Sequence, residues 1–243
     1  MNTLRVATYN IHKGVQGLGP AKRLEIHNLA LAMGSFDADV VCLQEVRHSN
    51  RREALRFDHW PEQAQAEFLA PPGYEAIYRT NAVTRHGEHG NALLSRWPIL
   101  ACQHQDISDH RLEQRGFLHV TLSVRGQAVH VLVVHLGLIR RSRVRQLASL
   151  RHYIDSKIAA QAPVLLAGDF NELRQRLDVG LSQSGLQAWP VPHATFPSRL
   201  PLVQLDHVFA RGMTPLSLVV PRGKKWWRMS DHLPLIAEFS LPK

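Results

Sequence analysis

Short runs of valine, isoleucine and leucine recur along the whole chain, and this recurrence constrains the fold more than any other feature of the sequence. Runs of this length, bounded by turn residues, are typical of buried β-strands. The clearest lie at 4–11, 39–46, 91–94, 117–124, 128–136, 163–167, 204–210 and 233–239. Amphipathic periodicity predicts helices at 22–33 and 143–158. The chain is therefore predicted to consist mainly of strands, with a few helices outside them.

Two of these strands, at 117–124 and 128–136, are joined by the short turn Arg125-Gly126-Gln127. Such a connection is typical of a β-hairpin, so the sheets are expected to be at least partly antiparallel. Hairpins mixed with β-α-β segments predict packed sheets covered by helices, an α/β (α+β) architecture. The length of 243 residues suits one large domain, and no linker or repeat interrupts the sequence. A single domain spanning residues 1–243 is predicted.

The net charge of the chain is +9 and its isoelectric point is about 10.1, which favours polyanionic partners such as nucleic acid, anionic lipids or phosphorylated metabolites. No apolar stretch approaches the length of a membrane span, and the N-terminus does not resemble a signal peptide. We therefore expect a cytoplasmic protein without a transmembrane segment. Cys42 and Cys102 stand in apolar runs and are expected to be buried free thiols.

Polar residues capable of catalysis stand at the ends of the predicted strands. These strand ends contain Asn10, Glu45, His135, Asp169, Asn171, Asp206, Asp231 and His232. Each motif alone has an ordinary structural explanation; Asp169, for example, could simply cap a helix. All of them together are poorly explained by chance, and polar strand ends can converge on one cleft. The sequence therefore predicts a polar site at one edge of the sheets.

Seven motifs occur in a fixed order along the chain. They are Tyr9-Asn10, Leu43-Gln44-Glu45, Leu94-Ser95-Arg96, His135-Leu136, Gly168-Asp169-Phe170-Asn171, Leu205-Asp206-His207 and Ser230-Asp231-His232-Leu233-Pro234. This series resembles the endonuclease/exonuclease/phosphatase superfamily, and the chain resembles a stand-alone bacterial member of it. The resemblance implies a DNase I-like four-layer α/β/β/α sandwich, with two central, mostly antiparallel sheets flanked by helices. At His135-Leu136-Gly137 the chain differs from AP endonucleases, which carry a Tyr-x-Pro-Asn pattern there.

The resemblance also implies a role for each motif. Glu45 would be the principal metal carboxylate, with Asn10 and Asp231 beside it, and oxygen ligands of this kind suit Mg²⁺ or Mn²⁺. Asp169 would orient or deprotonate the attacking water, and Asn171 would hydrogen-bond the phosphate. His232, paired with Asp206, would contact the scissile phosphate, and His135 would be a second catalytic histidine. Which histidine acts as general acid stays open.

Two further residues are assigned to substrate binding by the same resemblance. Asn91 stands just before a strand, and Arg115 matches a phosphate-contacting arginine of DNase I-like proteins, although it could also be a plain surface arginine. The polar segment 80–90 is expected to be a mobile substrate loop. Glu75 and Glu88 are candidate acidic partners of His135.

Two basic segments have alternative interpretations. The arginines of 140–145 could form an anion-binding ridge or a solvated helix start. The segment 224–228, which contains Trp226 and Trp227, could stack on bases, enter a membrane interface or pack in the core, and core packing is favoured. The fifteen histidines show no spacing typical of a zinc site.

The leading functional hypothesis is a divalent-metal-dependent phosphodiesterase, a hydrolase that acts on nucleic acid. The protein is expected to be a monomer. The alternatives are a sphingomyelinase-like phospholipid phosphodiesterase and a phosphatase of inositol phosphates or other small metabolites. A nucleic-acid-binding module without catalysis is the non-enzymatic alternative. It is disfavoured because all the catalytic positions are filled. The sequence leaves the substrate, the endo or exo mode and the number of metal ions open.

Overall fold

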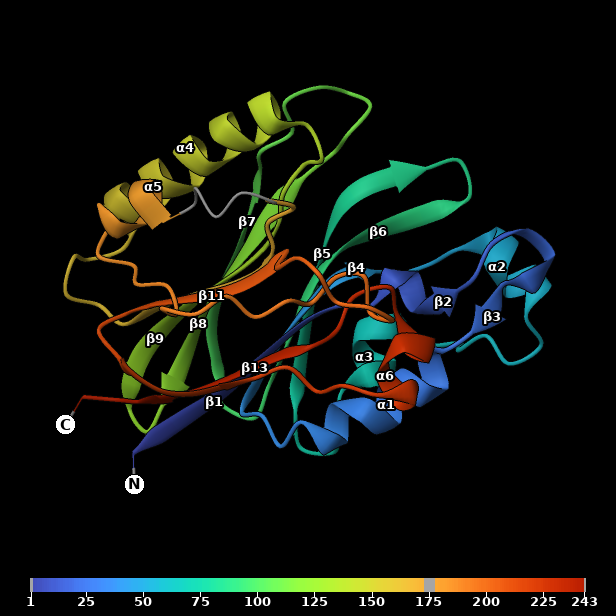
Figure 1. The fold of residues 1–243 in the computed structure, drawn as a ribbon, viewed down its shortest axis with the longest axis horizontal. Coiled ribbons are helices and arrows are strands. Elements are labelled where there is room, and N and C mark those ends of the chain that lie inside the picture. Colours follow the sequence, from blue (N-terminus) through green and yellow to red (C-terminus); the bar gives the residue numbers. More distant parts are fainter. Residues whose placement is uncertain (1, 173–177, 243) are drawn as a thin grey trace.

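Two large β-sheets form the centre of the molecule in the computed structural model, which describes residues 2–172 and 178–242. The six-stranded sheet has the order β12 (Thr214–Val219), β13 (Leu235–Ser240), β1 (Thr3–Asn10), β4 (Val40–Val46), β6 (Gly87–Ser95), β5 (Glu75–Thr84). The five-stranded sheet has the order β11 (Asp206–Arg211), β10 (Val164–Asp169), β9 (Gln127–His135), β8 (Gly116–Val124), β7 (Ile99–Asp106). The sheets pack face to face (Figure 1).

Helices cover the outer faces of both sheets (Figure 1). The outer face of the six-stranded sheet carries α1 (Ile26–Ser35), α3 (Gln65–Leu69) and α6 (Lys224–Met229), and that of the five-stranded sheet carries α4 (Arg140–Lys157) and α5 (Asp178–Ser182). The remaining elements are η1 (His12–Gly14), η2 (Gly19–Ala21), α2 (Arg51–Arg56) and the hairpin of β2 (Val15–Gln16) and β3 (Arg23–Leu24). The predicted four-layer α/β/β/α sandwich is confirmed. None of the described helices is both long and apolar enough to cross a bilayer.

Strand β9 shows why the apolar runs are continuous rather than alternating. Val129, Val131 and Val133 face the other sheet, whereas Leu132 and Val134 face the layer that contains α4. All five side chains are fully buried. A strand buried on both faces needs apolar residues at every position, and such a run is stabilised by the removal of apolar surface from water on either side.

Each sheet contains one parallel pair of strands, and the other pairs in both sheets are antiparallel. In the pair β1/β4, Asn10 lies opposite Gln44, and in the pair β9/β10, His135 lies opposite Asp169. The two pairs contact each other across the sandwich. Because parallel strands end at the same edge, four carboxyl ends meet in one place. This arrangement creates the position of the candidate site.

In the two large sheets, three strands were not predicted from apolar runs: β5, β7 and β12. All three lie at the edges of their sheets, where many of their side chains are exposed and polar. Edge strands need little apolar surface, so they leave no continuous apolar run in the sequence. Cys102 lies on the edge strand β7 and is only partly buried, contrary to the prediction, whereas Cys42 is fully buried.

The helices and one loop also differ from prediction. Helix α1 begins at Ile26 rather than residue 22, because Arg23 and Leu24 pair with the β2 strand. Helix α4 begins three residues earlier than predicted, at Arg140. The prediction of a mobile loop at 80–90 is wrong, since β5 and β6 pair through this segment up to the turn between Thr84 and Gly87.

Candidate active site

A cavity of about 370 Å³ opens at the edge of the sandwich where the two parallel pairs end. It is lined by Asn10, His12, Glu45, Arg115, His135, Leu138, Arg143, Asp169, Asn171, Phe196, Leu205, Asp231 and His232. Eight of the ten predicted site residues are among them. The two others, Asp206 and Asn91, lie outside the lining.

The inward faces of the strands explain why polar groups meet here. Along β10, Leu165 and Ala167 pack between the sheets, and Asp169 is the next inward position. Along β9, the inward valines are followed by His135. Each strand is thus apolar between the sheets and polar where it reaches the edge, as the alternation of side chains in a strand requires.

Glu45 reaches the cavity through an irregularity in β4. The pairing of β4 with β6 shifts register between Leu43 and Val46, and Glu45 has a φ of +57°. His12 and Asn171, with φ values of +45° and +50°, also combine a left-handed backbone with a place in the cavity lining. Such conformations are disfavoured for residues with a Cβ atom and are concentrated at functional sites.

Gly168 allows the two central strands of the second sheet to approach at the site. A Cβ atom at this position would lie 2.0 Å from the carbonyl oxygen of Val134, and the φ of Gly168 is +151°. A residue with a side chain would therefore push β10 away from β9. The glycine that precedes Asp169 in the sequence keeps Asp169 beside His135.

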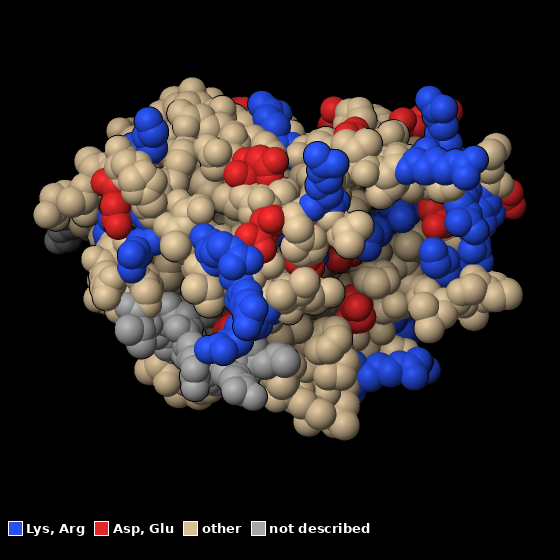
Figure 2. All heavy atoms as spheres, turned by 90° about the horizontal axis from the view of Figure 1, so that it is seen from above, with Lys and Arg blue, Asp and Glu red and all other residues tan. Residues whose placement is uncertain are grey.

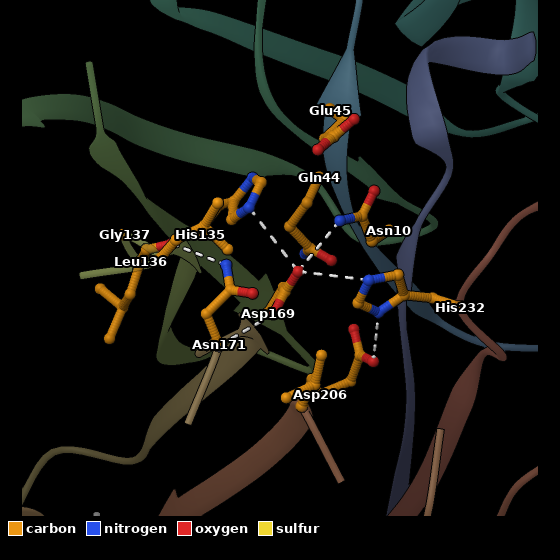
Figure 3. A network of polar contacts seen from close by, with 12 residues as sticks. Asn10, Gln44, Glu45, His135, Leu136, Gly137, Asp169, Asn171, Asp206 and His232 are labelled. Carbon is orange, nitrogen blue, oxygen red and sulfur yellow. Dashed lines mark hydrogen bonds and ion pairs between the residues drawn. The ribbon is translucent and has the colours of Figure 1, made fainter. Parts of the chain in front are cut away.

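Asp169 is the centre of the polar network in the cavity (Figure 3). The Asn10 side-chain amide donates a 3.0 Å hydrogen bond to Oδ2, and the Asn171 backbone N–H donates a 2.9 Å bond to Oδ1. The Nε2 atoms of His135 and His232 each lie 3.6 Å from Oδ2. Two histidines, from different elements, thus flank one buried carboxylate at more than hydrogen-bond distance.

The two histidines differ in their electrostatic surroundings. Burial, together with the charge of Arg115, lowers the pKa of His135 to about 4. Burial acts in the same direction on His232, but the charges of Asp206 and Asp169 and the hydrogen bond to Asp206 outweigh it and raise the pKa of His232 to about 10. At neutral pH, His135 is therefore neutral and His232 is cationic.

Asp206 acts on the site through His232. Nδ1 of His232 donates a 2.8 Å hydrogen bond to Oδ2 of Asp206, and the hydroxyl of Thr195 donates a 2.6 Å bond to the same oxygen. Asp206 is fully buried behind the histidine. The predicted pairing of these two residues is present, and it fixes both the orientation and the charge of the imidazole.

Three oxygen-bearing side chains, Asn10, Glu45 and Asp231, line the cavity and match the donor set that the sequence assigns to a metal ion. Glu45 accepts a 2.5 Å bond from the Lys13 ammonium, and Asp231 lies 3.2 Å from Nδ1 of His12. Burial raises the pKa of Glu45, but the charge and hydrogen bond of Lys13 outweigh it, and the pKa lies below its ordinary value. An ionised, all-oxygen set fits a hard divalent cation.

Another group, Asp169, Asp206 and His232, has ligand-type atoms within 4.8 Å of one another and is the one such cluster found in residues 2–172 and 178–242. A cationic histidine cannot offer a lone pair, and one oxygen of Asp206 already accepts two hydrogen bonds. This group is better explained as a hydrogen-bonded network than as a metal site.

The backbone of Leu136–Leu138, directly after His135, forms hydrogen bonds with several side chains. Each N–H and C=O group of this segment is hydrogen-bonded. The side chains that bind it are those of Glu113, Arg115, Arg143, Gln146 and Asn171. Arg115 and Arg143 thereby stand fixed in the cavity wall, and each also pairs with a carboxylate, Arg115 with Glu113 and Arg143 with Glu172, at 3.4 Å in both cases.

Three expectations about neighbouring residues are not met. The Asn91 amide donates to the backbone oxygens of Gly116 and Val133 on the opposite sheet and lies fully buried, outside the cavity lining. Glu88 accepts a hydrogen bond from Thr80, and Glu75 lies exposed, so the carboxylate beside His135 is Asp169 instead.

The tryptophans of α6 divide between two environments. Trp226 stacks on Phe36 at a centroid distance of 5.6 Å and contacts Tyr9 edge-on, as the favoured core interpretation predicts. Trp227 lies under the Arg199 guanidinium at 4.5 Å. Trp226 is therefore a packing residue of the six-stranded sheet rather than a ligand-stacking group.

Comparison with known proteins assigns the chain to one family. The model of the Endonuclease/Exonuclease/phosphatase family matches residues 7–232, nearly the whole chain. The chain belongs to this family. Family members are generally hydrolases of phosphoester bonds. The match runs from the strand that carries Asn10 to His232 and so includes both ends of the cavity.

Several known proteins are similar to nearly the whole of this chain. The uncharacterized protein YbhP of Escherichia coli K12 is 36% identical over 248 residues, covering 98% of this chain and 97% of that protein. A family protein from Beutenbergia cavernae has a TM-score of 0.78 at 21% identity, covering 99% of this chain and 72% of that one. A family protein from Bacteroides vulgatus has a TM-score of 0.78 at 16% identity, with 99% of both chains covered. The mannosyl-6-phosphatase of Bacteroides thetaiotaomicron has a TM-score of 0.72 at 18% identity, covering 97% of this chain and 99% of that one.

Some residues of the site carry no clear signal in the sequence. His12 and Lys13 stand two and three residues after Asn10, yet no spacing distinguishes them from solvated side chains. Thr195 precedes its partner Asp206 by eleven residues and lies outside the apolar runs. Arg143 belongs to the basic segment 140–145, and only the structure separates this buried arginine from its exposed neighbours.

Proposed function

We propose that this chain is a divalent-metal-dependent phosphodiesterase that uses Asp169 as the base for an attacking water. The observation that carries the proposal is the geometry around Asp169. Its carboxylate is oriented by Asn10 and by the backbone of Asn171, and it lies 3.6 Å from a histidine on either side. Burial raises the pKa of Asp169, against the opposing charges of both histidines, which makes the carboxylate a stronger base than a solvated one.

The other cavity residues would act on the phosphate. His232 carries a positive charge that attracts the phosphoryl oxygens, and Asp206 holds the imidazole in position. Arg115 and Arg143, each paired with a glutamate, would be fixed donors to the phosphoryl oxygens from the cavity wall. His135, which is neutral, can hydrogen-bond an oxygen of the substrate, and Asn171 lies beside it in the cavity wall.

Asn10, Glu45 and Asp231 would hold Mg²⁺ or Mn²⁺. When bound, the cation would supply Lewis-acid polarisation of the phosphoryl oxygen. Lys13 and His12 would keep the two carboxylates ionised and oriented toward the cavity. A hydrolase with this donor set is expected to lose activity when divalent cations are removed.

The catalytic groups do not choose between substrates. The net charge of +9 supports nucleic acid as the first candidate substrate. We propose that the protein acts on it as a monomer. One observation favours a phospholipid as the second candidate: Leu138 lines the cavity and is 69% exposed, so an apolar group stands beside the phosphate position. A phosphatase of small phosphorylated metabolites is the third candidate, and one structural neighbour is named a mannosyl-6-phosphatase.

The proposal is tested by hydrolysis of a small aryl phosphodiester, DNA, RNA and phospholipid vesicles with Mg²⁺ or Mn²⁺, alongside an aryl phosphomonoester. Cleavage of at least one diester, abolished by Asp169→Ala, supports it. Cleavage of the monoester with every diester intact contradicts it. Glu75→Ala, a change on the exposed edge strand β5, is the matched control and is expected to retain full turnover.

A further inference from the structure

An apolar and basic surface borders the catalytic cavity. It is formed by the loop between β7 and β8 together with the segment that leads from β9 into α4. Its members are Arg111, Leu112, Leu138, Ile139, Arg140 and Arg141, here called the leucine–arginine rim. All six are exposed, and Leu112, Leu138 and Ile139 are 97%, 69% and 51% exposed. Leu138 also lines the cavity, so the rim continues into the site.

The two segments of the rim are tied together. The Leu138 N–H donates a 2.8 Å hydrogen bond to Glu113, and the Ser142 hydroxyl donates a 2.7 Å bond to Asp109. Because the backbone of Leu136–Leu138 is fully hydrogen-bonded, the exposed leucine is held outward by a rigid loop. A rigid, exposed apolar group beside a catalytic cavity indicates a surface built for contact rather than a fraying loop.

The charges on the rim are unbalanced. Both acidic groups of these segments already have partners. Asp109 interacts with Ser142 and Arg145. Glu113 interacts with Arg115 and with the backbone N–H of Leu138. In contrast, Arg111, Arg140 and Arg141 have no hydrogen-bond or ion-pair partner among the described residues. Lys and Arg side chains also cover more of the face in Figure 2 than Asp and Glu do. The rim therefore presents apolar side chains flanked by free positive charge.

We propose that the leucine–arginine rim docks the protein on an anionic lipid surface, so that the cavity faces lipid headgroups. Leucine and isoleucine side chains enter the interfacial region of a bilayer, and arginines beside them attract anionic headgroups. Nucleic acid fits the rim less well, because base stacking needs aromatic rings and the rim carries none. The inference favours phospholipid, the second candidate substrate of the preceding section, and it rests on the phosphodiesterase function proposed there.

Docking is measured separately from catalysis, as co-sedimentation of the full chain with vesicles. A chelator is present so that metal-dependent hydrolysis does not occur. The vesicles contain phosphatidylglycerol mixed with phosphatidylcholine, or phosphatidylcholine alone. The test variant is Leu112→Ser with Ile139→Ser; serine is a favoured residue at the helix start that Ile139 occupies, so α4 is preserved. The matched control is Leu55→Ser, at a leucine that is 91% exposed on α2.

Wild type and Leu55→Ser are expected to bind the anionic vesicles. The affinity of the test variant for these vesicles should be at least about 10-fold weaker. Salt should reduce the binding of every protein. Absence of wild-type binding, or equal binding by the test variant, overturns the proposal. Loss of affinity for single-stranded DNA in the test variant, with no vesicle binding by wild type, also overturns it, in favour of a nucleic-acid partner. Hydrolysis of an aryl phosphodiester separates the phosphodiesterase proposal from the docking proposal. If neither wild type nor the variants hydrolyse it, the phosphodiesterase function is contradicted, whereas the vesicle result still decides the docking. Thermal unfolding confirms that each variant is folded.

Discussion

Nδ1 of His232 lies 2.8 Å from Oδ2 of Asp206, a carboxylate that is fully buried behind it. This contact makes one histidine of the cavity cationic, whereas His135, on the other side of Asp169, is neutral. Asp206, which lies outside the cavity lining, is therefore together with Asp169 what keeps the pKa of His232 high.

Replacement of Asp206 by Asn is expected to lower kcat by about 10²-fold, within the range for acid–base and positioning groups. The pKa of His232, about 10 in the parent, should fall, because the amide carries no charge. The basic limb of the kcat–pH profile should then move to lower pH, since the cation is lost earlier as pH rises. Thr195→Val, which removes one hydrogen bond to Asp206 and keeps its charge, should shift the limb less. An unchanged profile in Asp206→Asn would contradict the role of the pair.

The affinity for the divalent cation should fall selectively when Glu45 is replaced by Gln. The variant keeps the shape of the side chain and removes its charge, so the Mg²⁺ or Mn²⁺ concentration for half-maximal diester hydrolysis should rise at least about 10-fold. The rise in melting temperature that the cation gives the parent should shrink in parallel. Asp37→Asn, at an exposed carboxylate paired with Arg96 on the surface, is the control and should respond like the parent. Full activity of chelator-treated parent protein would refute the metal requirement.

Asn91 and Arg115 should respond to mutation in opposite ways. Asn91→Ala removes two hydrogen bonds that join the sheets at a fully buried position, so the free energy of unfolding should fall by about 1–3 kcal/mol. Turnover at saturating substrate should change little. Arg115→Met should instead lower kcat/KM at least about 10-fold through loss of a cavity charge. Denaturant unfolding and steady-state kinetics on both variants separate the two roles, and a large loss of turnover in Asn91→Ala would restore the substrate-binding prediction.

Acid should destabilise the fold through its buried histidines. Burial lowers the pKa of His119, His135 and His207 to about 4 in each case. A lowered folded-state pKa means that the unfolded chain binds the proton first, so stability is complete above about pH 6.5 and is lost as pH falls toward 4. Each histidine contributes up to about 1.4 kcal/mol per pH unit in that window. In urea unfolding between pH 7 and 4.5, His119→Gln should show a shallower pH dependence, and an unchanged slope would count against this assignment.

The sequence predicts the central strands well because burial on both faces leaves apolar runs such as 128–136. It predicts the residues of the cavity because inward alternation and strand ends place Asn10, His135 and Asp169 together. It misses the edge strands, whose stability comes from backbone pairing rather than apolar side chains. It also misplaces Asn91, since a buried amide that bonds backbone oxygens of the other sheet has the same sequence context as one that faces substrate.

The parallel pairs at the centre of each sheet have a consequence for how the protein tolerates change. Asn10 and Glu45 belong to one sheet, and His135 and Asp169 to the other. The alignment of the proposed catalytic groups therefore depends on the relative position of the two sheets. The side chains that set this relative position, such as Val133 and Leu165, lie in the interior beneath the site. Substitutions there can lower turnover while the protein stays folded, so loss of activity alone does not locate a residue in the catalytic cavity.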